Sequence, residues 1–586
     1  MKQIAYNLII PFLLLCYISA MGQTKYFYNK YTTHNEHLWT MVMLYDHNGN
    51  FILSGPAGDN FFNSYLPFVL VVNQTGALAD SIDRIQTVAN ATIYGGVSTE
   101  QGYALVGVID SVQNNSNGAA YLYLLDTGHQ VINQKIVGST QYTNHAQTVC
   151  RTPDGGFLLG GEIQPYDSTV VGPPTHPYLI RLDPQGNVLW DTIYYNCCTT
   201  YYSRINELLP APDGGYYGIG TRNSNFYFGD AMLLKINEDG SLAWSKFISY
   251  GHIETGNNMV LMPDGGYILM GAVANHDDFP FTQSGLIVKL NANLEEEWRR
   301  VDLFEGYRPV NIILTDDGNI FLSGGQDLLS SSLDVELCKI SPSGQLLWQR
   351  FYGSSQDDYA WAMLPASDGG FVIGGWVMED DTARVTVLKV NCMGLLTEPQ
   401  AAFSTYQTGD SPLEVGFQNL SQYVYPDSID GGYYVWDFGD GSPPFVCGQG
   451  YGACPALVTH DYATQGQYAA TLTAFVCTDT ATVTQQFSVV PTAVGQVAVP
   501  TYHISVLPNP ASDVLHLEAV GALSSSHELQ FSLYDAMGRA VRRLALRANG
   551  GSVRLDVADL PQGLYFWTCY SPDMVLQSGR VVIGER

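Results

Sequence analysis

The chain has 586 residues, of which 46% are apolar and only 14% are charged. This length exceeds one ordinary hydrophobic core, so we expect several domains, and the low charge with abundant Gly and Tyr favours turn-rich β structure. The formal net charge of -29 would repel phosphate backbones and anionic lipids, which excludes nucleic acid and acidic membranes as expected partners.

The first 22 residues have the pattern of a secretory signal peptide. Lys2 precedes an apolar run over residues 8–18, and small residues follow as far as Gly22. The run is shorter than the ~20 residues of a membrane helix. Cys16 could carry a lipid, but Leu15 is bulky where lipoprotein signals need a small residue. We predict cleavage near Gly22, export, and no transmembrane helix in the mature chain.

Residues 23–398 contain seven copies of one sequence pattern. Each copy has a turn that begins with a polar residue, then a hydrophobic strand, and a glycine seven residues after the polar one. Successive copies start 51–59 residues apart, which is room for one four-stranded sheet per repeat and is the spacing expected of propeller blades. The sequence therefore predicts a seven-bladed β-propeller. Clear copies run from Asp154 to Gly161, Asp213 to Gly220, Asp264 to Gly271 and Asp368 to Gly375, and weaker ones start at Asn48, Glu100 and Asp317.

Each repeat also has a second polar turn, followed in four repeats by a strand with a tryptophan at a fixed place. A sheet of this size cannot cover both of its faces alone, so we expect these tryptophans to fill contacts between blades. They are Trp190, Trp244, Trp298 and Trp348.

The last repeat lacks such a fourth strand. Residues 25–31 precede the first repeat in the same way that residues 244–250, a fourth strand, precede the repeat that starts at Asp264. We therefore predict that the N-terminal strand completes the seventh blade. Such a strand removes the open sheet edge between the first and last blades.

One face of the predicted disc carries loops that vary in length, and such loops on a rigid frame are where recognition usually lies. Aromatic rings beside polar groups suit a glycan or protein ligand, although packing of the rings on the rim explains them equally well. The candidate binding residues of this face are Tyr201, Tyr202, Phe226, Tyr227, Phe228, Asp277, Asp278, Phe279, Phe281, Asp357 and Asp358.

The sequence contains no nucleophile elbow, zinc-binding helix, phosphate-binding loop or Cys-x-x-Cys pair. Residues 34–37 hold two histidines and an acid, but without the spacing of a helical ligand pair. Loop carboxylates such as Glu254 could pair as the acid and base of a glycosidase, which needs a separation of about 5–10 Å. The sequence does not place two of them at that distance, so no catalytic residue is assigned and metal content stays unknown.

Residues 399–491 follow a different pattern. Trp436-Asp437-Phe438-Gly439-Asp440-Gly441-Ser442 precedes His460-Asp461-Tyr462 and a strand after Gly466. This segment resembles the PKD domain, which implies an immunoglobulin-like β-sandwich. Asp437 and Asp440 could hold calcium, but hydrogen bonding within the turn explains them as well. No other cofactor is expected.

Ten cysteines occur in the chain. The predicted oxidising compartment makes a disulfide among Cys447, Cys454 and Cys477 plausible. Cys150, Cys338 and Cys569 lie in apolar strand patterns and are expected to act as small core residues. For the adjacent pair at 197–198 we favour packing or a local disulfide over metal binding.

A linker over residues 492–502 leads to a final module at 503–586, which we expect to be a small β-sandwich. Its motifs occur in the order and spacing of the C-terminal sorting domain of the type IX secretion system of Bacteroidetes, and the module resembles that family. Arg580 stands where these domains often have Lys. The motif residues are Pro508, Asn509, Pro510, Asp535, Gly538, Arg539, Gly563, Tyr565 and Arg580.

The sorting-domain resemblance implies passage through the type IX secretion machinery, followed by release or attachment at the outer-membrane surface. We expect an exported, non-enzymatic binding or adhesion protein whose propeller recognises a glycan or protein ligand. Two alternatives remain: a carbohydrate-active enzyme that uses loop carboxylates of the propeller, and a structural surface protein.

Overall fold

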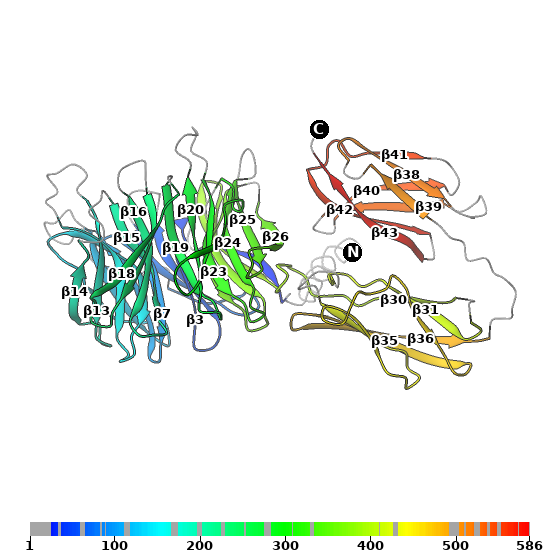
Figure 1. Cartoon of the computed structure of the whole chain (residues 1–586), viewed down its shortest axis with the longest axis horizontal. Coiled ribbons are helices and arrows are strands. Elements are labelled where there is room, and N and C mark those ends of the chain that lie inside the picture. Colours follow the sequence, from blue (N-terminus) through cyan, green and yellow to red (C-terminus); the bar gives the residue numbers. More distant parts are fainter. Residues whose placement is uncertain are drawn as a thin grey trace, which may run out of the picture. The chain divides into compact units, whose positions relative to one another are not determined.

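The computed structural model describes residues 25–584 except 33–36, 59–64, 83–84, 88, 111–117, 166–173, 196–201, 224–228, 251–252, 275–282, 307–308, 328–332, 355, 409–410, 426–431, 492–502, 509–510, 521–527, 536–538, 548–551 and 572–573. The predicted signal peptide and Cys16 lie outside this range. Every regular element of the described residues is a β-strand (Figure 1), so the predicted all-β fold class is confirmed.

The chain divides into two compact units, which are described separately. The first comprises Met1–Phe403, Asn419–Ala456 and Ala469–Gln485, and the second comprises Ser404–Gln418, Leu457–Tyr468 and Gln486–Arg586. The repeats lie in the first unit and the C-terminal module lies in the second.

The repeats fold into antiparallel groups of four strands in chain order, except that the first group has five, because its first strand is divided into two short strands that pair with the same neighbour. The strand Phe27–Tyr31 supplies the fourth strand of the last group. The groups are β2 (His37–Leu38) with β3 (Val42–Tyr45), β4 (Phe51–Gly58), β5 (Tyr65–Val72), β6 (Leu78–Ile82); β7 (Ala91–Thr99), β8 (Gly102–Ile109), β9 (Ala119–Asp126), β10 (Val131–Ile136); β11 (Thr143–Arg151), β12 (Phe157–Gln164), β13 (His176–Leu182), β14 (Val188–Ile193); β15 (Tyr202–Pro210), β16 (Tyr216–Asn223), β17 (Gly229–Ile236), β18 (Leu242–Ile248); β19 (Ile253–Leu261), β20 (Tyr267–Ala274), β21 (Gln283–Leu290), β22 (Glu296–Arg300); β23 (Pro309–Leu314), β24 (Ile320–Asp327), β25 (Leu333–Ile340), β26 (Leu346–Tyr352); and β27 (Asp358–Pro365), β28 (Phe371–Glu379), β29 (Thr382–Val390), β1 (Phe27–Tyr31).

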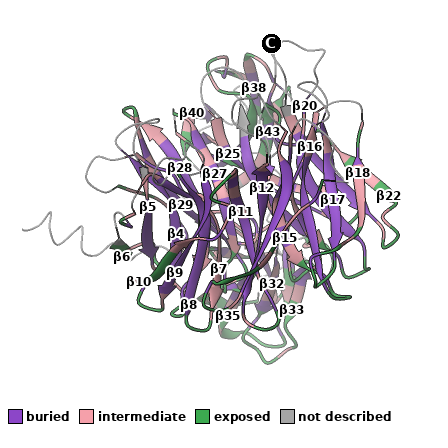
Figure 2. Ribbon diagram, turned by 90° about the vertical axis from the view of Figure 1, so that its left-hand side faces the viewer, coloured by how far each residue is buried: buried purple, intermediate pink, exposed green. Residues whose placement is uncertain are grey.

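The first strands of the groups contact one another in a closed cycle: β3 with β7, then β11, β15, β19, β23, β27 and again β3. Sheets that cover one another around a ring bury faces that a lone sheet would expose. Buried residues accordingly run along the strands, while the exposed ones gather at the turns (Figure 2). From this cycle we infer a propeller of seven blades.

The remaining strands form smaller antiparallel sheets. Residues 403–489 contain a sheet of β30 (Phe403–Gln407), β31 (Glu414–Asn419) and β34 (Val458–Asp461), and one of β33 (Phe445–Gly448), β32 (Tyr433–Asp437), β35 (Gly466–Val476) and β36 (Asp479–Val489). The C-terminal module contains β37 (His503–Leu507), β38 (Val514–Val520) and β41 (Val553–Asp556), with a second sheet of β40 (Ala540–Arg547), β39 (Glu528–Tyr534), β42 (Gly563–Ser571) and β43 (Met574–Ile583).

The repeated glycine marks a place where two backbones nearly touch. Gly220 on β16 pairs with Ile205 on β15, and the next pair joins Ile219 to Glu207, so β15 has one extra residue, a β-bulge. A Cβ on Gly220 would lie 1.9 Å from the carbonyl oxygen of Arg204. The equivalent distance is 1.6–1.9 Å at Gly55, Gly107, Gly161, Gly271 and Gly375. Only glycine fits there, whatever its backbone angles.

The aspartate of the repeated turn binds a cation from the third strand of its own blade. Asp264 Oδ2 lies 2.6 Å from Lys289 Nζ, and the Lys289 side chain is only 2% exposed. The other pairs are Arg181 with Asp154, Lys235 with Asp213, Lys339 with Asp317 and Lys389 with Asp368. Where the turn instead begins with Asn48 or Glu100, the third strand has Val71 or Leu124 at the equivalent place. Anchor and partner therefore change together.

The tryptophans of the fourth strands lie between blades. The ring of Trp190 lies beneath Gly240 in the next blade, where an added Cβ would come within 2.4 Å of it. Trp298 and Trp348 meet Gly344 and Gly394 in the same way.

At one contact between neighbouring blades, an acid and a histidine take the places of the tryptophan and the glycine. Asp80 takes the position of the tryptophan in the first blade. It pairs with Val71 on the third strand there, as Trp190 pairs with Arg181 in the third blade. His129 takes the turn position of the glycine, with φ 66°. The two side chains approach within 3.5 Å, and the buried His129 also lies 3.8 Å from Asp46. An acid and a histidine thus stand where Trp190, Trp298 and Trp348 each place a ring against a turn glycine.

The N-terminal strand closes the ring and is held by residues far away in sequence. β1 pairs with β29 from Phe27 opposite Lys389 to Tyr31 opposite Val385. Just before β1, Tyr26 donates a hydrogen bond to Asp479 at 2.5 Å. A disulfide joins Cys392, in the turn after β29, to Cys477, in the turn between β35 and β36.

The cysteine pairing agrees only in part with the pairing expected from the sequence. Of the three for which a disulfide was expected, Cys447 and Cys454 pair with each other. Cys477 pairs with Cys392, a partner that was not predicted. The remaining described cysteines are buried thiols, as expected: Cys150, Cys338 and Cys569.

Replacement of the repeated glycine tests the close approach of the two backbones. We expect Gly220→Ala to lower the free energy of unfolding by about 3 kcal/mol or more, because the backbone must move to admit the methyl group. Gly218→Ala in the same strand is the control, since its Cβ would lie 3.3 Å from the flexible tip of Ile236 and should cost less than about 1 kcal/mol. Denaturant unfolding measures both, and equal losses would contradict the interpretation.

The ion pair of the turn can be removed by replacing the aspartate alone or by replacing both partners. Asp264→Asn keeps the turn bond to Gly266 but leaves the buried Lys289 without a carboxylate, which should cost about 1–2 kcal/mol because Asp264 is partly screened by water. The hydrogen bond from Lys289 lowers the pKa of Asp264 below 3.8. Its stabilisation is therefore present above about pH 4 and is lost as the pH falls further.

The first blade supplies the matched control for this change. The double variant Asp264→Asn with Lys289→Val reproduces the pair Asn48 and Val71 and should recover most of the lost stability. Thermal unfolding between pH 2.5 and 7 would show both effects. A double variant no more stable than Asp264→Asn would count against the pairing.

Candidate functional site

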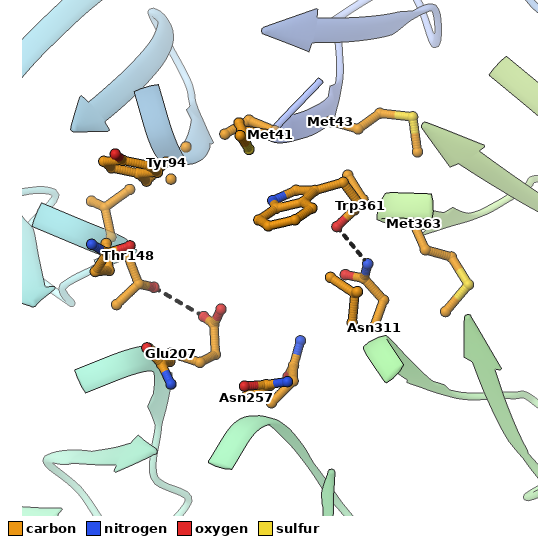
Figure 3. Close-up of a pocket in the computed structure, with 18 of the residues that line it drawn as sticks. Met41, Met43, Tyr94, Thr148, Glu207, Asn257, Asn311, Trp361 and Met363 are labelled. Carbon is orange, nitrogen blue, oxygen red and sulfur yellow. Dashed lines mark hydrogen bonds between the residues drawn. The ribbon is translucent and has the colours of Figure 1, made fainter. Parts of the chain in front are cut away.

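A cavity of about 260 Å³ lies among the first strands of the blades, along the axis of the ring (Figure 3). We call this cavity the central channel. It is lined by Met41, Val42, Met43, Leu44, Tyr94, Gly95, Gly96, Gln147, Thr148, Val149, Arg204, Asn206, Glu207, Asn257, Asn258, Val310, Asn311, Trp361, Ala362 and Met363.

The β-bulges explain why the lining contains neighbours in sequence. In a regular strand successive side chains point to opposite faces, so only alternate residues could reach the axis. The bulge on β15 skips Asn206, and both Asn206 and Glu207 line the channel. The bulge on β19 does the same for Asn257 and Asn258. The bulge beside the repeated glycine therefore lets two consecutive residues of β15, and two of β19, line the channel.

The channel has an apolar wall and a polar wall. Trp361 points into the space and Met41 lies near it, whereas the side chains of Met43 and Met363 point outward (Figure 3). Glu207 and Asn257 lie across from Trp361 (Figure 3). This combination suits a ligand with an apolar face and hydrogen-bonding groups at its edge.

Amide side chains of the polar wall are fixed by the neighbouring blade. Asn206 Nδ2 donates to the carbonyl oxygen of Gly256 at 2.6 Å, and Asn257 Nδ2 donates to that of Pro309 at 3.1 Å. Asn311 Nδ2 donates to the carbonyl oxygen of Trp361 at 2.7 Å. These bonds tie the blades together and orient the amides before any ligand arrives, which reduces the entropy that binding would lose.

Glu207 and Arg204 are the two charged residues of the lining. Glu207 Oε1 accepts hydrogen bonds from Thr148 Oγ1 at 3.1 Å and from the Leu208 amide at 3.2 Å. Burial in the channel disfavours the charged carboxylate and raises the pKa of Glu207 to about 7. Near neutral pH this group can therefore act both as a hydrogen-bond donor and as an acceptor.

No metal centre is found among the residues that the structure describes, since no three His, Cys, Asp or Glu side chains there group as ligands. Asp437 accepts a hydrogen bond from the Gly439 amide at 2.9 Å. Asp440 accepts bonds from the amide and hydroxyl of Ser442. Both aspartates thus make the turn contacts that explain them without calcium.

Most of the predicted loop residues lie outside the described residues. These are Tyr201, Phe226, Tyr227, Phe228, Asp277, Asp278, Phe279 and Phe281. Tyr202 is described and half-buried at the start of β15, where Arg204 lies 5.6 Å from its ring. Burial raises the pKa of the Tyr202 hydroxyl, and the nearby Glu162 adds to the effect.

Asp357 and Asp358 hold loops together. Asp357 Oδ1 accepts from the Leu333 amide at 2.9 Å. Asp358 is fully buried and accepts bonds from Ser354 and from the hydroxyl of Tyr28 on the closing strand. Glu254, the other candidate carboxylate, is also fully buried.

Sequence reasoning missed the channel residues, although the repeats contain a signal for them. The residue at the bulge stands 14 residues before the repeated glycine in six repeats and 13 before it in the second. If the repeats are aligned on the glycine and extended toward the N-terminus, this position identifies Met41, Tyr94, Gln147, Asn206, Asn257, Val310 and Trp361.

The motif residues of the C-terminal module occupy turns and strands. Asp535 binds Arg539 through its side chain at 2.8 Å. The hydroxyl of the buried Tyr565 donates to the Pro561 carbonyl oxygen at 2.8 Å. Gly563 begins β42 opposite Ile583, Arg580 pairs with Phe566, and Pro508 is exposed. Asn509, Pro510 and Gly538 lie outside the described residues.

Titration of Glu207 should appear in the stability of the protein. Because its folded pKa of about 7 lies above the ordinary 4.5, the stability that it contributes is complete below pH 4.5 and is lost as the pH rises through 7. We expect Glu207→Gln to remove this loss, so that the variant gains in unfolding temperature relative to the parent between pH 5 and 8. Thermal unfolding across that range measures the difference, and a difference independent of pH would contradict it.

The comparison with curated proteins gives no match. Among solved structures, the PKD1 domain of Vibrio anguillarum Epp has 26% identity and a TM-score of 0.13, covering 16% of this chain and 98% of its own. An endo-arabinase from Bacteroides thetaiotaomicron VPI-5482 has 9% identity and a TM-score of 0.28, with coverage of 41% and 92%. A xylan beta-1,4-xylosidase from Bacillus halodurans C-125 has 12% identity and a TM-score of 0.28, with coverage of 69% and 92%.

Two families match parts of the chain. Residues 404–487 match the PKD domain, and residues 505–583 match the secretion system C-terminal sorting domain. The described residues contain no helix that is long and apolar enough to cross a membrane. The chain thus carries a PKD domain and a type IX sorting domain, which mark it as a secreted or surface-attached protein.

Proposed function

We propose that this protein is an exported, non-enzymatic binding protein whose propeller recognises a ligand at or beyond the cell surface. The type IX secretion machinery handles the sorting domain, and the PKD domain spaces the propeller from it. The central channel and the variable loops around its mouth form the recognition region. One observation carries the proposal: all the blades contribute residues to a channel whose walls combine an aromatic ring with oriented amide groups.

The composition of the channel supports binding more than hydrolysis. A glycosidase uses two carboxyl groups on opposite sides of the scissile bond. The channel lining has one carboxyl group, Glu207, which is bonded to Thr148. Amides fixed by backbone carbonyls of the next blade are suited to selecting hydrogen-bonding groups, because they need not reorient.

The full-length chain tests this function directly. We expect it to bind a glycan or protein on arrays of both kinds, and to release no reducing sugar from polysaccharides or peptide from proteins during prolonged incubation. Glu207→Gln serves as the control for catalysis. Turnover that this change abolishes would replace the binding function with an enzymatic one, and an array without any partner would favour a purely structural protein.

A further inference from the structure

The central channel is narrow, which limits the ligand that it can hold. Its volume of about 260 Å³ is below the ~300–1,000 Å³ typical of sites for drug-sized molecules. One small ring fits this space, whereas an oligosaccharide or a folded peptide does not. Because the surrounding strands are joined around the ring, the channel cannot widen without breaking contacts between blades.

The charge of the lining argues against an ionic ligand. A phosphate, sulfate or carboxylate ligand is usually held by several cations or converging backbone amides. Arg204 is the single cation of the lining, and Glu207 lies near it on the same strand. A cationic ligand would find one carboxyl group whose ionisation burial already disfavours. An uncharged ligand meets neither difficulty.

The two walls argue for a ring with two different surfaces. A purely apolar ligand would cover Trp361 but would displace water from the Oδ1 atoms of Asn206 and Asn257, which costs free energy. A pyranose or furanose presents C–H groups on one face, which can stack on an indole, and hydroxyl groups around its edge. Those hydroxyls can both donate and accept, as amide and carboxyl groups can.

We propose that the central channel binds one neutral sugar residue, stacked on Trp361 and hydrogen-bonded at its edge by Asn206, Asn257 and Glu207. This inference rests on the proposed binding function and adds the site and the class of ligand. The sugar is either a free monosaccharide or the end of a longer chain.

Glu207 gives the site a preference that depends on pH. At or below pH 7 its protonated carboxyl group can donate to a sugar hydroxyl, whereas above pH 7 it only accepts. The ionised group also repels an anionic sugar. Among the residues lining the channel, Arg204 is the one fixed positive charge that opposes this repulsion.

The test is calorimetric titration of the full-length chain with glucose, galactose, mannose, xylose, arabinose and N-acetylglucosamine at millimolar concentrations. We expect at least one sugar to bind. Trp361→Leu and Asn257→Ala should each weaken its binding at least tenfold, while thermal unfolding shows that each variant is folded at the temperature of the titration. Tyr451→Ala is the control, because this tyrosine is 59% exposed on the PKD domain and is not part of the channel. It should change nothing.

A charge comparison separates the site from a general affinity for sugars. If glucose is the sugar that binds, glucuronate should bind at least tenfold more weakly than glucose at pH 8, and Glu207→Gln should reduce that ratio. If another hexose binds, its own uronate takes this role. Retention of sugar binding in both Trp361→Leu and Asn257→Ala, or its loss in Tyr451→Ala, would overturn the channel site.

The outcome for the channel is distinct from the outcome for the binding function. If none of the neutral sugars binds while the arrays detect a glycan or protein partner, the channel inference fails and the binding function stands. If the chain hydrolyses a substrate, the binding function itself fails. Sugar binding that follows the pattern predicted for the variants supports both.

Discussion

The structure depends on a steric constraint at one glycine in each of six blades. The carbonyl oxygen of the innermost strand lies so close to the α-carbon of this glycine, as Arg204 does to Gly220, that no side chain fits. The approach accompanies a β-bulge in the inner strand, which adds one residue to that strand without lengthening its partner. Two consecutive side chains then reach the axis of the ring. A constraint on backbone packing thus sets the chemistry of the channel.

The contacts between and within blades follow a repeated plan with local substitutions. Five blades join the aspartate of the turn to a cation of the third strand, whereas the first uses Asn48 with Val71. Several contacts between blades place a tryptophan beneath a turn glycine, whereas one uses Asp80 with His129. In the ion pairs both partners change. A buried charge without its partner is costly, which is the physical reason why the changes occur together.

The ring is closed by segments from distant parts of the sequence. The strand that begins at Phe27 lies beside β29, and the residues around it bind Asp479 and Asp358. The disulfide between Cys392 and Cys477 constrains the same region covalently. An open edge between the first and last blades would expose unpaired backbone groups. These contacts therefore stabilise the part of the ring where chain connectivity does not hold the blades together.

The sequence by itself determined the features that act locally or repeat: all-β structure, blade-sized repeats, and the motifs of the PKD and sorting domains. Turn chemistry and strand alternation operate over a few residues, so they can be read without coordinates. The repeated glycine was visible too, but its cause was not, because the carbonyl oxygen that excludes a side chain belongs to another strand. Only the tertiary structure decided which residues meet at the axis, that Cys477 pairs with Cys392, and that Asp358 holds the closing strand. Each of these depends on how distant strands approach one another, and closure of the ring sets that approach.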